Sequence, residues 1–159
     1  MTISHFKPEQ QQELRDFVLT IQNNEFSLGF KANEQSDLED TGSFYTGGGF
    51  WLAHHEGQLV GCIGLQKLDR TTGVLRKLFV KKEFRGTEHQ IAGHLFANLK
   101  NKARTLGFER ILLDTPAVAK ASHRFYEKNG FLEVDRSQLP SAYKFPDRNS
   151  KIMALQLKK

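Results

Sequence analysis

The first part of the chain carries two apolar patterns with different spacing. A strand is expected at Ile3 to Phe6. A helix is expected after Pro8, where apolar residues recur at helical intervals at Leu14, Phe17, Val18 and Ile21. From Ser27 to Gly49 the periodicity weakens, and SDLEDTGSFY predicts only a short helical turn. This part of the chain therefore predicts a strand, a helix and an irregular stretch.

The middle of the chain reads as three consecutive strands. FWLAHHEGQLVGCIGLQKL predicts two strands joined by a tight turn at Glu56-Gly57, and GVLRKLFVKKEF predicts a third. Consecutive strands with short connections favour an antiparallel meander. The sequence therefore predicts a three-stranded antiparallel unit here.

Helical spacing returns after the third strand. One apolar stripe predicts a helix that ends near Gly107; its members are Ile91, Ala92, Leu95, Phe96, Leu99 and Ala103. A buried strand is expected at Glu109 to Thr115, then a short helix, VAKASHRFYEKN, that ends at Asn129-Gly130. FLEVD and KIMALQL predict two closing strands. A strand–helix–strand unit within an otherwise antiparallel sheet indicates a mixed α/β fold.

Composition and charge narrow the class of protein. The 159 residues are 38% hydrophobic and 26% charged, which suits one folded domain over residues 1–159. We expect a cytoplasmic protein, because the sequence has no membrane-length apolar run and no signal-peptide pattern. The single cysteine, Cys62, lies in the apolar run LVGCIGL and predicts a buried thiol in a reducing compartment. The formal charge of +5 favours anionic partners without choosing among nucleic acid, nucleotide cofactor and acidic substrate.

The segment FVKKEFRGTEHQIAGHLF, Phe79 to Phe96, supports two interpretations. An apolar strand leads through a basic turn with Arg85-Gly86 into a helix, and free N–H groups at a helix N-terminus favour an anion. The guanidinium of Arg85 suits phosphate oxygens. Thr87 and Gln90, however, also match a capping box that would use two of those N–H groups. The loop alone leaves both interpretations open.

A second motif, ASHRFYEKNGF from Ala121 to Phe131, favours the phosphate interpretation. Together with KLFV, FRG and IAGHLF it resembles the GNAT superfamily of N-acetyltransferases, most strongly from Leu75 to Val134. The resemblance implies a mostly antiparallel sheet with one splayed parallel strand pair, flanked by helices. It also implies acetyl-CoA as acyl donor, an amine as acceptor and no metal. The cofactor-binding positions that it implies are Leu78, Phe79, Val80, Arg85, Gly86, Thr87, Gln90, Ile91, Ala92, Gly93, His123, Phe125, Tyr126 and Lys128.

The loop departs from the usual family pattern R-G-x-G-x-G/A. Aligning Ile91-Ala92 with its final two positions makes the loop two residues longer and puts Gln90 where the middle glycine normally lies. The proline often found after the strand's valine is replaced by Lys82. These departures bear on the phosphate contacts more than on the fold.

The resemblance also assigns catalytic roles. A backbone N–H in the strand Leu78 to Val80, with Leu78 the candidate, would stabilise the oxyanion formed when an amine attacks the thioester. Tyr126 would protonate the departing thiolate, since a phenol is protonated at neutral pH. A tyrosine beside a phenylalanine in a helix is otherwise typical of a core position.

The general base and the acceptor stay open at this stage. Carboxylates or imidazoles near the acceptor could act as base, as could a water chain; the candidates are Glu25, Asp37, Asp40, His54 and His55. The acceptor region is expected within Asn23 to Gly49. His54-His55 does not predict a metal site, because neighbouring strand residues point to opposite faces.

Three functions are compatible with these observations. The first is an N-acetyltransferase acting on a primary amine of a small molecule, amino acid or peptide. The second is a non-catalytic acyl-CoA-binding or regulatory module, and the third is a nucleic-acid binder, which the dispersed basic residues disfavour. No membrane partner is expected, and a homodimer is left open.

Overall fold

In the computed structural model the described residues are 1–25, 35–86, 89–117, 119–143 and 150–157. They form strands, α-helices and short turns of 3-10 or π-helix, in chain order β1 Thr2–His5, η1 Pro8–Gln10, α1 Gln11–Thr20, η2 Ile21–Glu25, η4 Ser36–Leu38, α2 Thr41–Phe44, β2 Gly49–His55, β3 Gln58–Lys67, β4 Thr72–Val80, η5 Lys82–Phe84, α3 Ile91–Thr105, β5 Arg110–Pro116, α4 Lys120–Lys128, β6 Leu132–Glu133, η6 Arg136–Gln138 and β7 Ser150–Gln156.

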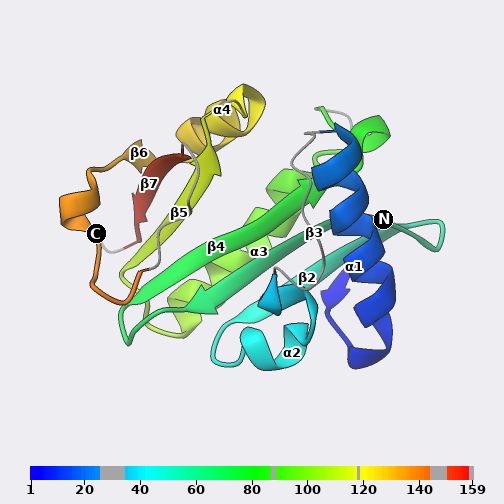
Figure 1. The fold of residues 1–159 in the computed structure, drawn as a ribbon, viewed down its shortest axis with the longest axis horizontal. Coiled ribbons are helices and arrows are strands. Elements are labelled where there is room, and N and C mark those ends of the chain that lie inside the picture. Colours follow the sequence, from blue (N-terminus) through cyan, green and yellow to red (C-terminus); the bar gives the residue numbers. More distant parts are fainter. Residues whose placement is uncertain (26–34, 87–88, 118, 144–149, 158–159) are drawn as a thin grey trace.

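The strands form one mixed sheet in the order β1-β2-β3-β4-β5-β7-β6. Every neighbouring pair is antiparallel except β4 and β5, which are parallel and connected through α3. Figure 1 shows α3 behind the strands and α1 and α2 in front of them. The expected mixed fold with one parallel strand pair is confirmed.

Each face of the sheet has its own apolar core. On the α3 face, Leu95, Phe96 and Leu99 pack with residues of the central strands and with Tyr126 and Phe131. On the opposite face, α1 and the α2 region pack against β2 and β3, and this cluster includes Cys62. The thiol of Cys62 is fully buried, as its apolar run predicted, and burial raises its pKa well above the usual value.

The β2–β3 hairpin closes through the predicted turn. Glu56 and Gly57 have φ values of 51° and 80°, so both central residues are left-handed, as a two-residue turn between twisted strands requires. Gly107 likewise ends α3 in a left-handed conformation, with φ 82°. These turn positions agree with the sequence interpretation.

The start of α3 corrects the capping-box interpretation. The helix begins at Ile91, and its N-cap is Gln90, which makes no capping hydrogen bond through its side chain. The capping box required Thr87 as N-cap, three residues earlier; Thr87 itself lies outside the described residues. Gln90 has a left-handed backbone conformation, with φ 51°, so the helix can begin only at the residue after it.

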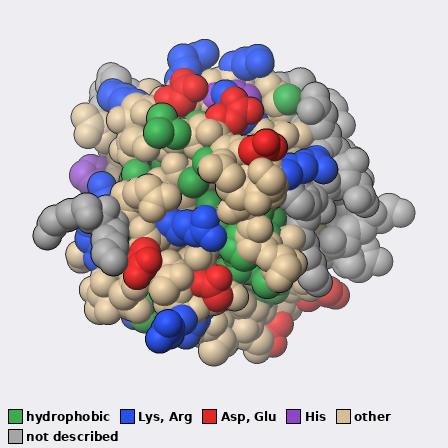
Figure 2. All heavy atoms as spheres, turned by 90° about the vertical axis from the view of Figure 1, so that its left-hand side faces the viewer, with side chains coloured by type: hydrophobic (Ala, Val, Ile, Leu, Met, Phe, Trp, Pro, Cys, Tyr) green, Lys and Arg blue, Asp and Glu red, His purple; other side chains and the backbone are tan. Residues whose placement is uncertain are grey.

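Charge is mixed on the surface at the β6–β7 end of the sheet. Figure 2 shows Lys and Arg side chains interspersed with acidic ones on this face. Along the described ranges, no helix is both long and apolar enough to cross a bilayer.

Gly64 in β3 gives a test of packing on the α1 face. A Cβ at Gly64 would lie 2.7 Å from Cε1 of Tyr45 and 2.8 Å from Cδ2 of Phe50. We therefore expect Gly64→Ala to lower the free energy of unfolding by about 1–3 kcal/mol. The control is Gly42→Ala in α2, whose Cβ would come no closer than 3.9 Å to its nearest neighbour. Equal denaturation midpoints for the two variants would contradict the packing.

Candidate active site

A large cavity lies where β4 and β5 separate. The two strands pair only at Thr72–Val74 with Arg110–Leu112, although β4 continues to Val80 and β5 to Pro116. Figure 1 shows them diverging towards α4. A cavity of about 1090 Å³ fills this region, lined by both strands, the start of α3 and α4. Its volume is slightly above the range typical of small-molecule sites, about 300–1,000 Å³.

A bulge in β4 shapes the middle of this cavity. The register against β3 shifts between Cys62 and Gly64, where one residue of β3 faces two of β4, Lys77 and Leu78. Lys77 is left-handed, with φ 56°. Its carbonyl oxygen accepts a hydrogen bond from the Cys62 thiol at 3.1 Å. A buried side chain of the neighbouring strand thus holds the bulged peptide.

This geometry directs the Leu78 N–H into the cavity. The carbonyl and N–H of a trans peptide point in opposite directions, and no described peptide is cis. Because the Lys77 carbonyl points towards Cys62, the Leu78 N–H points away from it. Leu78 lines the cavity, and at the bulge it has no partner residue in the β3–β4 register. A main-chain donor in a cavity is what oxyanion stabilisation needs.

The start of α3 presents further main-chain donors. The residues from Gln90 to Gly93 line the cavity, and no acceptor for the N–H groups of Ile91, Ala92 or Gly93 is recorded in the described part of the chain. These groups lie at the positive end of the helix dipole and suit an anion. The left-handed Gln90 adopts the conformation that a glycine would take with least strain at the same position.

Arg85 lies between this helix and the end of β4. Its Nε donates to the Val80 carbonyl oxygen at 2.8 Å, and the side chain lines the cavity. The guanidinium therefore occupies one main-chain acceptor at the end of β4. Gly86, next in the loop, has φ 109° and nothing within 4 Å of a Cβ position.

Tyr126 brings a phenol to the same cavity from α4. Its ring is 6% exposed and packs against Phe125 and Phe131. Burial, and next the charge of Asp114, raise the pKa of Tyr126 well above its ordinary value. The hydroxyl is therefore protonated at neutral pH. Within the described residues it has no recorded hydrogen-bond partner, so it is available to a ligand.

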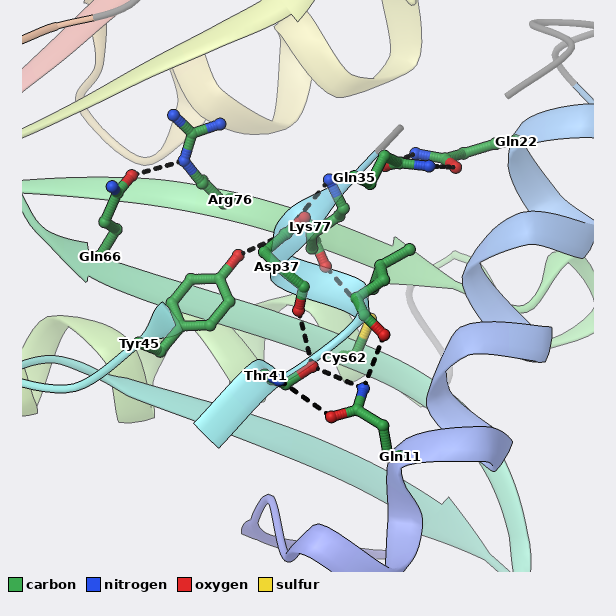
Figure 3. A network of polar contacts seen from close by, with 11 residues as sticks. Gln11, Gln22, Gln35, Asp37, Thr41, Tyr45, Cys62, Gln66, Arg76 and Lys77 are labelled. Atoms are coloured by element: carbon green, nitrogen blue, oxygen red, sulfur yellow. Dashed lines mark hydrogen bonds and ion pairs between the residues drawn. The ribbon is translucent and has the colours of Figure 1, made fainter. Parts of the chain in front are cut away.

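A polar cluster supports the wall opposite α3, as Figure 3 shows. Lys77 Nζ lies 3.3 Å from Asp37 Oδ2, which also accepts a 2.8 Å hydrogen bond from Tyr45. The Asp37 carbonyl accepts from the Thr41 hydroxyl, and Gln11 in turn contacts Thr41. Burial lowers the pKa of Lys77, and the charge of Asp37 opposes this effect. This cluster therefore holds in place the side chain of Lys77, the left-handed residue in β4.

Twelve of the fourteen sequence-predicted cofactor positions lie on the cavity wall: Leu78, Phe79, Val80, Arg85, Gly86, Gln90, Ile91, Ala92, Gly93, Phe125, Tyr126 and Lys128. Thr87 lies outside the described residues. His123 does not line the cavity: it is 6% exposed, and its Nε2 lies 3.0 Å from the Pro116 carbonyl oxygen. His123 thus connects α4 to the end of β5.

The candidate bases lie elsewhere. Asp37 is paired with Lys77, Asp40 caps α2 through Ser43, and His54 lies 3.6 Å from Glu13. None of these three lines the cavity, nor does His55, which packs near Phe84 and His89. The side chain of Glu25 lies outside the described residues, as do residues 26–34 that follow it. Three or more metal-ligating side chains do not gather anywhere in the described part.

Five charged residues of the cavity were missed by the sequence analysis: Arg76, Lys77, Asp114, Lys120 and Arg124. Asp114 and Arg76 lie on the two strands that separate. Asp114 lies near the end of β5 and accepts a 2.6 Å hydrogen bond from the Tyr143 hydroxyl. Arg76 lies just before the bulge in β4. Each interrupts an apolar strand, which is the one signal in the sequence that could have found them.

Comparison with known proteins also identifies an acetyltransferase, the class that the sequence motifs predicted. A model of the acetyltransferase (GNAT) family matches residues 15–131. The crystal structure of an acetyltransferase from Streptococcus agalactiae is 36% identical, with a TM-score of 0.93 and 98% of both chains covered. The chain belongs to the acetyltransferase (GNAT) family, and the predicted resemblance is confirmed.

Two further similarities involve longer proteins. N-acetylaspartate synthetase from Danio rerio is 34% identical over 107 residues, which are 65% of this chain and 37% of that protein. N-acetylglutamate synthase from Neisseria gonorrhoeae, solved with coenzyme A and N-acetyl-glutamate, shares the fold at 21% identity and a TM-score of 0.78, over 99% of this chain and 35% of that one. The chain spans about half the length, or less, of the curated relatives it matches.

The three tyrosines of the chain give a spectroscopic prediction. Burial, followed by the charges of Asp37 or Asp114, raises the pKa of Tyr45, Tyr126 and Tyr143. Their contribution to stability is complete below the unfolded-state pKa of about 10 and is lost as the pH rises towards the folded-state values. We expect phenolate absorbance to stay low in the native protein through about pH 10 and then to rise together with the loss of far-ultraviolet circular dichroism. A noncooperative increase in phenolate absorbance near pH 10, with the fold intact, would contradict this burial.

Proposed function

We propose that the protein is an N-acetyltransferase that moves an acetyl group from acetyl-CoA directly to a primary amine of a small molecule, amino acid or peptide. The observation that carries the proposal is the Leu78 N–H, which the bulge at Lys77 directs into the same cavity as the Tyr126 hydroxyl. One group could stabilise an oxyanion and the other could protonate a leaving group. Membership of the GNAT family supports the reaction class.

The cavity offers a place for each part of the donor. The α3 N-terminus, Gly86 and Arg85 would hold the pyrophosphate, with Lys128 adding positive charge from α4. The open edge of β4 would pair with the pantetheine arm and bring the thioester carbonyl to the Leu78 N–H. The relative from Neisseria gonorrhoeae, which contains coenzyme A, supports a CoA site in this fold.

The reaction would proceed in one active-site complex. The neutral amine nitrogen bonds to the carbonyl carbon, and negative charge collects on the carbonyl oxygen beside the Leu78 N–H. The C–S bond then breaks, the thiolate takes the Tyr126 proton, and the new amide nitrogen loses a proton to water. Water returns a proton to Tyr126, which restores the phenol. Burial beside Tyr126 would make the thiolate more basic than in solution as well, so the raised pKa of Tyr126 does not prevent the transfer.

The names of two relatives support amino acids within the acceptor class. N-acetylaspartate synthetase and N-acetylglutamate synthase are both named after acetylated amino acids. A cytoplasmic setting, proposed here from the single cysteine, would supply both acetyl-CoA and such amines.

Binding of the donor gives the first test. Acetyl-CoA at a hundred times its dissociation constant should raise the free energy of unfolding by about 2.7 kcal/mol, which is measurable as a thermal shift. Amine-dependent release of free thiol should accompany it. Stabilisation without thiol release from any amine of a broad panel would favour the non-catalytic acyl-CoA-binding module. Salt-sensitive DNA binding without a CoA-induced shift would instead favour a nucleic-acid binder.

Removal of one hydroxyl tests the role of Tyr126. We expect Tyr126→Phe to keep the dissociation constant for acetyl-CoA within a few-fold and to slow the acetyl-transfer step about 100-fold or more, because the thiolate then leaves without a positioned proton donor. Single-turnover measurement at saturating acceptor isolates that step. An unchanged single-turnover rate would remove Tyr126 from the acid role.

A further inference from the structure

The wall of the cavity opposite α3 carries a charge that acetyl transfer from CoA does not use. Arg76 is half-buried in β4 and lines the cavity. It lies on the same face as Val74, which packs with Tyr143, whereas Leu75 packs with the α3 cluster. Since the proposed phosphate site is at the start of α3, Arg76 faces the space left for the acceptor.

The guanidinium of Arg76 has a fixed orientation. Its Nε donates to Gln66 Oε1 on the neighbouring strand at 2.6 Å. Figure 3 shows the two terminal nitrogens on the side away from Gln66. Among the described residues no acceptor is recorded for these two nitrogens. A planar group held in this way presents its remaining N–H groups as a pair, which is the geometry that binds a carboxylate through two parallel hydrogen bonds.

The neighbouring charges favour such a ligand. The positive charge of Lys77 is compensated by Asp37 at 3.3 Å. Asp114 lines the same cavity from β5, and no ion pair between it and Arg76 is recorded in the described part of the chain. One Asp114 oxygen accepts the Tyr143 hydroxyl, which leaves the other for an ammonium group. The Arg76 guanidinium and the Asp114 carboxylate thus line the same part of the cavity, where they could bind the carboxylate and the ammonium group of a zwitterion.

We propose that the acceptor is an amino acid whose free carboxylate is bound by Arg76 and whose ammonium group is oriented by Asp114 before it loses a proton to water. This inference rests on the proposed acetyl transfer and names its acceptor class. Arg76 lies two residues before Leu78 in β4, and only the bulged Lys77 separates them. A small amino acid can therefore contact Arg76 with its carboxylate while its nitrogen approaches the carbonyl carbon near the Leu78 N–H.

Matched acceptors test the role of the carboxylate. Thiol release is measured with the standard amino acids, with their carboxamides and with the corresponding decarboxylated amines. For wild type we expect kcat/KM to be highest for forms with the carboxylate. Equal values for an amino acid and its carboxamide, or a preference for the amine, would overturn the inference while leaving acetyl transfer intact.

Substitutions at Arg76 test whether this side chain binds the acceptor's carboxylate. Arg76→Gln should lower kcat/KM for the free amino acid about 10- to 100-fold, the effect of losing charge-assisted hydrogen bonds, and change the value for the carboxamide little. Arg76→Lys should be intermediate, because an ammonium group lacks the planar fork. Arg104→Gln, exposed in the last turn of α3, is the control with the same change of charge. Equal losses for amino acid and carboxamide in Arg76→Gln would contradict the assignment.

Gln66 gives a second variant that leaves the charge in place. Gln66 does not line the cavity, so it acts as a positioning residue through its bond to Arg76 Nε. We expect Gln66→Met to reduce the preference for amino acid over carboxamide a few-fold without lowering kcat for the carboxamide. An unchanged preference would show that the orientation of the guanidinium does not contribute.

Binding of products separates this inference from the proposed function. In calorimetric titrations with CoA present, N-acetylated amino acids should bind wild type more tightly than their carboxamides do, and Arg76→Gln should abolish the difference. If no acceptor releases thiol but this difference is found, the proposed reaction fails and the carboxylate site stands. If thiol is released but Arg76→Gln binds both forms as wild type does, acetyl transfer stands and the carboxylate site fails.

Discussion

The site depends on the hydrogen bond between the Cys62 thiol and the carbonyl of the left-handed Lys77. A lysine at φ 56° costs about 1–2 kcal/mol relative to an ordinary strand conformation, so its surroundings must hold it there. Two groups do so. Cys62 holds the backbone from β3, and Asp37 holds the side chain through an ion pair that Tyr45 supports. As a result the Leu78 N–H faces the cavity, which regular pairing of a strand without the bulge would not ensure.

The bulge also explains why the cavity has two chemically different walls. Side chains alternate along a strand, and one extra residue resets which of them face α3. Before the bulge, Arg76 faces away from α3; after it, Leu78 and Val80 join the apolar cluster on the α3 face. Main-chain donors and a neutral phenol therefore line the side proposed for the donor. Arg76 and Asp114 supply charge on the side proposed for the acceptor. Acetyl transfer needs this division, because the thioester and the amine must approach one carbon from different directions.

Local pattern was enough to predict most of the fold. The hairpin at Glu56-Gly57, the long helix ending before Gly107 and the strand–helix–strand unit all follow from spacing and turn chemistry, which act over a few residues. The sequence could not show how far β4 and β5 stay paired, because that depends on contacts between distant segments. For the same reason Arg76 and Asp114 were missed: they approach only when two strands separated by α3 become neighbours. His123 has the spacing of a ligand-facing helix residue, yet the hydrogen bond to Pro116 places it on the buried side.

Gln90 shows how a local rule and a tertiary constraint differ. In the sequence, Thr87 and Gln90 match the capping-box pattern. Gln90 also stands where the family pattern R-G-x-G-x-G/A has its middle glycine. In the fold, Gln90 is left-handed and forms the N-cap itself, so the N–H groups of the first turn of α3 open into the cavity. Among the described residues, the non-glycine positions with positive φ are Glu56, Lys77 and Gln90, and the last two both line this cavity. Glu56 serves only a hairpin turn. The other two turn main-chain N–H groups towards a common space, one group where an oxyanion would form and the others where a phosphate would bind. Two of the three left-handed non-glycine residues in the described part of the chain thus lie where main-chain donors are needed, and at Lys77 the Cys62 hydrogen bond and the Asp37 ion pair hold this conformation in place.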